Sequence, residues 1–217
     1  MKIKLILLLL SSSLVFSASI GSNFLGVNIS HTKFEQTSGN FEVDGVGFGL
    51  IGNYNLYGAE SYGIDVNAEF SFANNLSGTP TTVEVEIARL DYVFRPYYQL
   101  PLIKIFADIG YSSIKSERTN PNSKLLDSNR FLPAIGFEGS IGPIGKSELY
   151  FAPTLDFVNY GYKAKGLMYS IPLSYPINEK FGINANCTQS SLDSYKIGST
   201  EIKNKFSVWS IGFDLKF

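Results

Sequence analysis

The chain has 217 residues, a formal net charge of −1 and a single cysteine, which cannot form an internal disulfide. The near-neutral charge provides no basic surface for nucleic acid, and one cysteine argues against a small disulfide-stapled secreted domain. Thirteen tyrosines, 17 phenylalanines and 20 glycines favour strands and tight turns over helices.

Residues 1–19 have the pattern of a secretory signal peptide. A short basic region carries Lys2 and Lys4, an unbroken apolar run follows over 5–10, and small residues occupy 17–19, where we expect cleavage. The apolar run is too short for a transmembrane helix. We therefore expect residues 20–217 to form one domain, with a net charge of −3 once the two lysines are removed.

Ten segments of this domain alternate apolar and polar residues with a period of two, which is the pattern of β-strands. In the third segment, for example, Tyr62, Ile64 and Val66 alternate with Gly63 and Asp65. The ten segments cover 23–35, 41–56, 62–73, 82–95, 102–115, 130–141, 148–160, 167–175, 181–191 and 206–217.

Most of these segments are longer than the five or six residues typical of soluble strands and match the length of a tilted strand that crosses a bilayer. The connections alternate between short and long, as expected for periplasmic turns and external loops. We predict an all-β fold, a single antiparallel up-and-down transmembrane β-barrel of about ten strands. Eight strands is the alternative if 167–175 and 181–191 are irregular, and a soluble β-sandwich is the competing fold.

Two features conflict with regular strands. Glu84 and Glu86 fall on the same face as Ala88 and Leu90, which is the face expected to contact lipid. Either the two glutamates stand above the membrane, or a β-bulge near Ile87 resets the register. Three prolines also fall inside strands, where they remove ladder donors, and we expect bulges or broken pairing there. These prolines are Pro133, Pro153 and Pro172.

Aromatic residues cluster at the strand ends, which predicts two girdles at the level of the lipid headgroups. The residues expected at the periplasmic rim are Tyr57, Tyr62, Phe94, Tyr97, Tyr98, Tyr175, Phe181 and Phe217. Those expected at the outer rim are Phe34, Phe41, Phe72, Phe131, Phe157, Tyr160, Tyr162 and Phe206.

The period of two places a set of charged side chains on the face of the strands that lines the lumen. A charge buried there without a partner of opposite sign costs several kcal/mol of stability. A barrel near eight strands is filled by side chains, so we expect these residues to close the lumen, with a narrow pore as the alternative. Glycines at 45, 47 and 49 share this face and should leave room for side chains from opposite strands. The predicted lumen network consists of Asp65, Glu69, Arg89, Asp91, Arg95, Lys104, Asp108, Arg130, Glu138 and Asp156.

No residue pattern indicates an enzyme, a cofactor site or a metal site. His31 is the only histidine, and it shares lipid-side parity with Ile29. Lipid A deacylases pair a histidine with a serine two residues away, but Lys33 stands there. An omptin-like protease needs an aspartate close to the histidine, which could be Asp127, Asp156 or Asp193. We expect His31 to be a rim residue without a catalytic role.

The last strand alternates Trp209, Ile211, Phe213, Leu215 and Phe217 on one face. With its terminal aromatic residue, it resembles the closing strand of bacterial outer-membrane β-barrels, in the broad group of OmpA-like, OmpX-like and porin-family small barrels. The resemblance implies outer-membrane localisation, contact with outer-membrane lipid and lipopolysaccharide, and recognition by the barrel-assembly machinery through Trp209, Phe213 and Phe217.

External loops on a rigid scaffold are common binding elements. The function we expect is therefore structural or adhesin-like, with the loops at 116–129 and 192–202 contacting a host or cell-surface ligand. A narrow pore for small solutes or ions is the alternative, and a rim hydrolase is a third interpretation.

Overall fold

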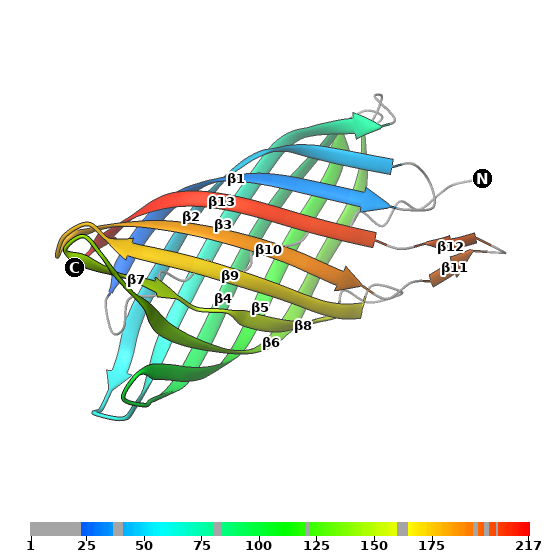
Figure 1. Cartoon of the computed structure of the whole chain (residues 1–217). Coiled ribbons are helices and arrows are strands. Elements are labelled where there is room, and N and C mark those ends of the chain that lie inside the picture. Colours follow the sequence, from blue (N-terminus) through cyan, green and yellow to red (C-terminus); the bar gives the residue numbers. More distant parts are fainter. Residues whose placement is uncertain are drawn as a thin grey trace.

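The computed structural model describes residues 23–36, 41–79, 84–119, 122–159, 165–192, 195–197, 200–202 and 204–217. Within these ranges the strands form one closed antiparallel barrel (Figure 1), and no helix is long and apolar enough to cross a membrane. The strands are β1 (Phe24–Gln36), β2 (Phe41–Gly58), β3 (Tyr62–Thr79), β4 (Glu84–Gln99), β5 (Ile103–Thr119), β6 (Asn122–Ile144), β7 (Ser147–Phe151), β8 (Thr154–Asn159), β9 (Lys165–Pro176), β10 (Phe181–Leu192), β11 (Tyr195–Ile197), β12 (Thr200–Ile202) and β13 (Asn204–Lys216).

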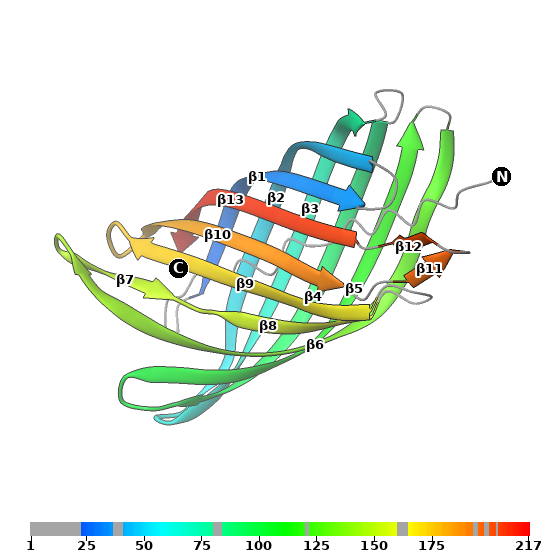
Figure 2. The same cartoon turned by 45° about the vertical axis from the view of Figure 1, so that its right-hand side comes forward.

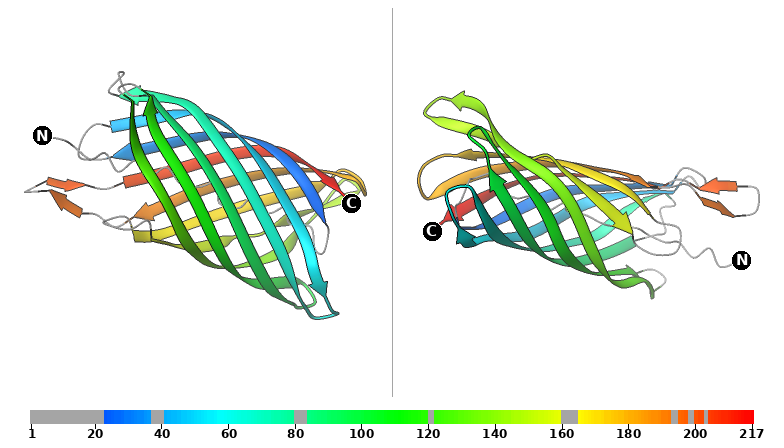
Figure 3. Two further views of the ribbon diagram at one scale, coloured as in Figure 1. Left: turned by 180° about the vertical axis from the view of Figure 1, so that it is seen from behind. Right: turned by 90° about the horizontal axis from the view of Figure 1, so that it is seen from below.

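Pairing between the first and last barrel strands closes the sheet. β1 pairs with β13 from Phe24 opposite Lys216 to Gln36 opposite Asn204, and these strands lie side by side in Figures 1 and 2. β7 and β8 share one position between β6 and β9, which gives ten strand positions. The predicted ten-stranded barrel is therefore confirmed, and the eight-stranded and sandwich alternatives are wrong. Figure 3 shows the strong tilt of the strands.

The three prolines have different outcomes. Pro153 separates β7 from β8, as expected from its missing N–H donor. Pro133 and Pro172 stay within β6 and β9 and keep their register with β5 and β10, but each is left out of the pairing with the strand on its other side. The ladder is only partly lost at Pro153, because its carbonyl accepts a hydrogen bond from the Phe137 N–H at 3.3 Å. The expected broken pairing is therefore confirmed at all three prolines, on one side only at Pro133 and Pro172, and only Pro153 interrupts a strand.

The bulge expected near Ile87 lies on the neighbouring strand. The register of β3 against β4 shifts between Ala73 and Leu76, which pair with Ile87 and Val85. β4 therefore keeps its own alternation, and Glu86 stays on the outer face at the external end of the barrel. The side chain of Glu84 lies outside the described residues.

Two segments expected to be external loops contain paired strand. β5 continues to Thr119 and β6 begins at Asn122, so most of 116–129 forms a hairpin that extends the barrel wall. Within 192–202, β11 and β12 form a separate two-stranded sheet, which projects beyond the ends of β10 and β13 in Figure 1. Both segments are therefore stiffer than unpaired loops.

The barrel presents apolar side chains outward and polar side chains inward. On β13, Phe213 is 61 % exposed, whereas the adjacent Asp214 is 1 % exposed. The same contrast separates Val27 from Asn28 on β1. This arrangement is the reverse of a soluble protein and is typical of a barrel whose outer surface contacts lipid. We call the outward apolar surface the lipid-facing belt.

Two residues predicted for the aromatic girdles instead point inward. Phe34 is fully buried in register with Val43, and with Leu76 these apolar side chains fill the inside of the barrel at its external end. The Tyr97 hydroxyl accepts a hydrogen bond from the side-chain amide of inward-facing Asn55 at 3.2 Å. The girdle residues whose side chains lie outside the described residues are Phe41, Tyr160, Tyr162 and Phe206.

Glycines on the inner face of β2 make room for adjacent strands, not for the opposite wall as predicted. A Cβ at Gly49 would overlap the Asn28 side chain, and one at Gly47 would lie 2.9 Å from the Ser30 hydroxyl. The same relation holds between Gly26 and Asp214. Long polar side chains thus lie over glycines of the neighbouring strand.

Gly212→Ala is expected to lower the free energy of unfolding by about 1–3 kcal/mol, because overpacking at a rigid site costs this much. A Cβ at Gly212 would overlap the Val27 carbonyl and lie 2.9 Å from the Asn28 Cβ. At Gly52 the closest atom to a Cβ is the Phe24 carbonyl oxygen at 3.7 Å, so Gly52→Ala is the control and should change stability by less than about 0.5 kcal/mol. Urea unfolding in lipid vesicles measures both, and equal losses would contradict this account of the glycines.

Candidate functional site

The candidate site is the interior of the barrel, where β3, β4, β5 and β6 supply the large charged side chains. The period of two along each strand places these residues on the inner face, where they face the smaller polar side chains of the opposite wall. Eight members of the predicted lumen network are buried, with exposures of 0–4 %. They are Asp65, Glu69, Arg89, Asp91, Arg95, Lys104, Asp108 and Glu138.

Lys104 joins two carboxylates from different strands. Its Nζ lies 3.3 Å from Asp65 Oδ2 on β3 and 3.2 Å from Glu138 Oε2 on β6. The amine also lies 4.7 Å from the centre of the Tyr97 ring, and the Asn55 amide donates to Asp65 Oδ1 at 2.8 Å. Since all three charged groups are about 97 % buried, each depends on the others to offset its lost hydration.

Two arginines on β4 form the other ion pairs. The Arg95 guanidinium donates two hydrogen bonds to Asp108, both at 2.7 Å, in the planar bidentate geometry that arginine and carboxylate favour. It also lies 3.8 Å from the centre of the Phe106 ring. Arg89 donates from Nε to Asp91 Oδ1 at 2.8 Å, two residues along the same strand. The contacts of Arg95 therefore tie β4 to β5 on the inner face of the barrel.

The opposite wall is lined mainly by neutral polar side chains, with Asp214 among them. The Asn184 amide donates to Asp214 Oδ1 at 2.6 Å, and the Asn186 amide donates to the Thr188 hydroxyl at 2.9 Å. The predicted network, which was restricted to charged residues, missed the neutral partners Asn184, Asn186, Thr188 and Asn55. The same inward parity would have found them.

Two predicted network members are not among these eight. Asp156 lies on β8 opposite Ala134 and is only partly buried, while the side chain of Arg130 lies outside the described residues. Among the described inward residues, seven acids face four bases: Asp65, Glu69, Asp91, Asp108, Glu138, Asp156 and Asp214 against Arg89, Arg95, Lys104 and Lys216. The lumen is therefore acidic within the described part of the chain.

His31 lies on the outer face, away from the lumen. Its Nε2 is 3.1 Å from Asp44 Oδ2, and both side chains are about half exposed. Asp44 was not among the aspartates considered from the sequence; Asp127 and Asp193 have side chains outside the described residues. Within the described ranges, no group of three or more histidine, cysteine or acidic residues could hold a metal ion.

His31→Ala is expected to leave any hydrolase activity of the refolded protein unchanged, because the described residues provide His31 with a carboxylate partner but no hydrogen-bonded serine or cysteine. Hydrolysis of peptide and lipid ester substrates would be compared with wild type. A loss of activity in this variant, with heat-modifiable gel mobility retained, would make His31 a catalytic residue.

The C-terminal strand places its proposed assembly residues on the lipid-facing belt. Trp209, Phe213 and Phe217 all point outward and are more than half exposed. Their recognition by assembly machinery remains a prediction.

A polar interior enclosed by an apolar outer surface defines an integral β-barrel of the outer-membrane type. The chain belongs to the family described by the outer membrane protein beta-barrel domain, whose model matches residues 4–217. Family and fold together indicate the bacterial outer membrane. The predicted signal peptide lies outside the described residues.

Several solved structures are similar to this chain at low sequence identity. The transport unit of the autotransporter AIDA-I from Escherichia coli has a TM-score of 0.50 and 9% identity, covering 97% of this chain and 93% of that chain. Neisserial surface protein A has a TM-score of 0.46 and 10% identity, covering 90% of this chain and 97% of that chain. The outer membrane protease OmpT from Escherichia coli has a TM-score of 0.46 and 11% identity, covering 91% of this chain and 98% of that chain. No curated protein matches the sequence significantly.

Proposed function

We propose that this protein is a closed barrel that presents stiff hairpins at the cell surface for contact with host matrix, another cell or lipopolysaccharide. The observation that carries the proposal is the ion-paired lumen, above all Lys104 bridging Asp65 and Glu138 at 3.3 and 3.2 Å. A lumen filled in this way leaves the surface elements as the parts available for function.

The external hairpins support the binding role. β5 and β6 pair as far as Thr119 opposite Asn122, and β11 pairs with β12 over Tyr195–Ile197 and Thr200–Ile202. Backbone pairing fixes these segments before a partner arrives, which lowers the entropic cost of binding.

Cells that display the full barrel are expected to adhere to at least one of three immobilised surfaces: collagen, laminin or lipopolysaccharide. Replacing 193–203 with a short Gly-Ser linker should reduce adhesion about tenfold, the loss expected when about 1.4 kcal/mol of contact is removed. A Lys180→Ala variant, in an exposed turn at the opposite end of the barrel, is the matched control. Adhesion to none of the surfaces, or equal adhesion after the replacement, would contradict the proposal.

A narrow cation pore is the second candidate function. The excess of seven acids over four bases among the described inward residues favours it, since a lumen of this charge would select cations if it opened. Conductance through the refolded protein separates the two functions.

A further inference from the structure

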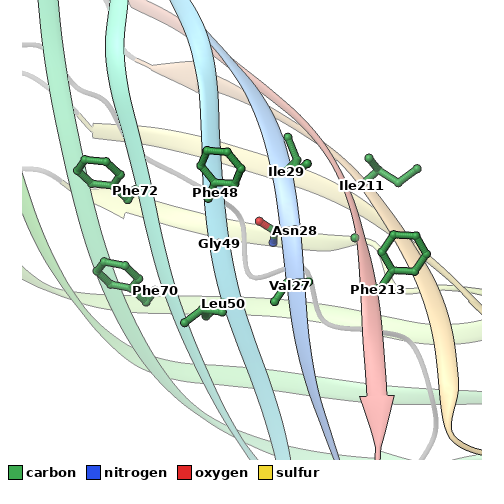
Figure 4. A pocket seen from close by; sticks show the side chains of 11 residues that line it. Val27, Asn28, Ile29, Phe48, Gly49, Leu50, Phe70, Phe72, Ile211 and Phe213 are labelled. Atoms are coloured by element: carbon green, nitrogen blue, oxygen red, sulfur yellow. The ribbon is translucent and has the colours of Figure 1, made fainter.

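One side of the barrel wall is paired from end to end. β1 pairs along its whole length, Phe24–Gln36, with β13 on one flank and with β2 on the other. A groove of about 760 Å³ crosses the lipid-facing belt on this side, over β1, β2, β3 and β13 (Figure 4). Aromatic side chains such as Phe48, Phe70 and Phe213 line it. The groove is therefore part of the lipid-facing belt, and the wall beneath it is closed by these pairings.

The external part of β6, by contrast, is paired on one side only. β5 pairs with β6 as far as Thr119 opposite Asn122, whereas β8 pairs with it only over 134–136. Among the described residues, none pairs with 122–133 on the β8 side. In Figure 2, this part of β6 rises together with β5 beyond the ends of β8 and β9. The barrel therefore presents an open strand edge at its external end.

The open edge exposes the backbone groups of alternate residues. The Phe137 N–H donates to the Pro153 carbonyl at 3.3 Å, so odd-numbered residues of β6 direct their N–H and C=O toward the open side. This alternation extends to Leu126, because the register with β5 is unbroken over that length, and a β-bulge at Leu125 then ends it. The residues whose backbone N–H and C=O both face the open side are Asp127, Asn129 and Phe131.

The open edge stands in water and not in lipid. An unpaired backbone N–H or C=O in hydrocarbon costs several kcal/mol, because no water is there to satisfy it. Phe131 is 60 % exposed on the outer face of β6, at the level predicted for the outer aromatic girdle, so 126–130 stand beyond the hydrocarbon. A strand edge exposed to water is a template for a strand of another chain.

We propose that this edge of β6 binds an extended polypeptide segment of a protein partner, which adds to the barrel wall as a further strand. The proposal rests on the proposed surface-binding function and names its class of partner. A polypeptide strand repeats N–H and C=O groups at the spacing that the edge presents, whereas lipid headgroups and glycans do not. Because main-chain hydrogen bonds supply the affinity, the edge accepts segments of different sequence.

Purified barrel in lipid nanodiscs tests this proposal with a defined probe. The probe is reduced and carboxymethylated α-lactalbumin, whose chain is unfolded, and native α-lactalbumin is the compact control of the same sequence. We expect the barrel to capture the unfolded chain and to bind the native protein about tenfold more weakly, a difference of about 1.4 kcal/mol.

Hydrogen exchange locates the bound chain. The amides of Asp127, Asn129 and Phe131 should exchange rapidly in the free barrel and slowly in the complex, because the added strand accepts from them. The amides of Ser128 and Arg130 face β5 and should exchange slowly in both states.

Two variants at one position separate main-chain from side-chain recognition. Asn129→Pro removes an N–H from the open edge and should weaken capture about fivefold, which corresponds to one lost hydrogen bond of about 1 kcal/mol. Asn129→Ala keeps the N–H and should bind like wild type. Pro133, whose nitrogen faces the same side, leaves β6 in register with β5, so a proline at 129 is compatible with the fold. Heat-modifiable gel mobility checks both variants.

Several results would overturn the proposal. They are no capture of the unfolded chain, equal capture of the native protein, equal binding by Asn129→Pro and Asn129→Ala, and rapid exchange of the three edge amides in the complex. The exchange result stands without any variant. The proposed surface function is measured separately, by adhesion of whole cells, so its failure is distinguishable from failure of the β6 edge to bind.

Discussion

Lys104→Met is expected to lower the free energy of unfolding by about 3–5 kcal/mol, because removing one partner of a buried ion pair leaves the others uncompensated. In the variant, the Asp65 and Glu138 carboxylates would remain about 98 % buried without the amine that lies 3.3 and 3.2 Å from them. A loss of this size is a large fraction of the 5–15 kcal/mol that stabilises a typical protein. Urea titration in lipid vesicles, followed by Trp209 fluorescence, measures the change.

Two further variants isolate the cause of this loss. Replacing the whole cluster, as Lys104→Met with Asp65→Asn and Glu138→Gln, removes the uncompensated charges and should restore most of the stability. Lys146→Met, in an exposed turn, should change stability by less than about 0.5 kcal/mol. If Lys104→Met alone is as stable as wild type, the lumen ion pairs do not hold the barrel together.

Phe213→Arg is expected to destabilise the barrel by about 2–4 kcal/mol in a bilayer, because an arginine on the lipid face near the midplane must be buried in hydrocarbon. Phe213 is 61 % exposed on the outer face of β13 and borders the groove in the lipid-facing belt. Unfolding in vesicles measures the loss, and the change should be much smaller in detergent micelles, where the charge reaches water.

Ser207→Arg provides the matched control on the same strand and face. Ser207 lies in register with Lys33, beyond the end of the lipid-facing belt, so an arginine there should cost only about 0–1 kcal/mol. Equal effects at 207 and 213 would mean that the two positions do not differ in depth, which would contradict the assignment of the belt.

The strands and their two faces followed from the period of two in the sequence. Ile211 and Phe213 alternate with Gly212 and Asp214, and the structure places the first pair outside and the second pair inside. The inward parity of the charged network residues follows from the same rule, and eight of them are buried. Their role in closing the lumen to solutes remains a prediction.

Features that depend on contacts between strands did not follow from the pattern. Phe34 was assigned to the outer girdle because it is aromatic and near a strand end, although its parity matches inward-facing Thr32. The sequence pattern did not distinguish Pro153, which interrupts a strand, from Pro133 and Pro172, which stay in register with β5 and β10. The pairing of Asp44 with His31 also required the register between β1 and β2.

The external hairpins were missed for a related reason. The residues at 116–129 and 195–202 are mostly polar, and their few apolar residues do not extend an alternation over the length of a membrane-crossing strand, as the other segments do. Only the pairing partners reveal them as strands.

Single-channel conductance of the refolded protein in a planar bilayer tests the central claim, that the lumen is closed and function resides at the surface. Heat-modifiable gel mobility establishes that the inserted protein is folded. The account predicts folded protein without unitary openings. Reproducible cation-selective openings would contradict it and would make the acidic lumen a conduction path.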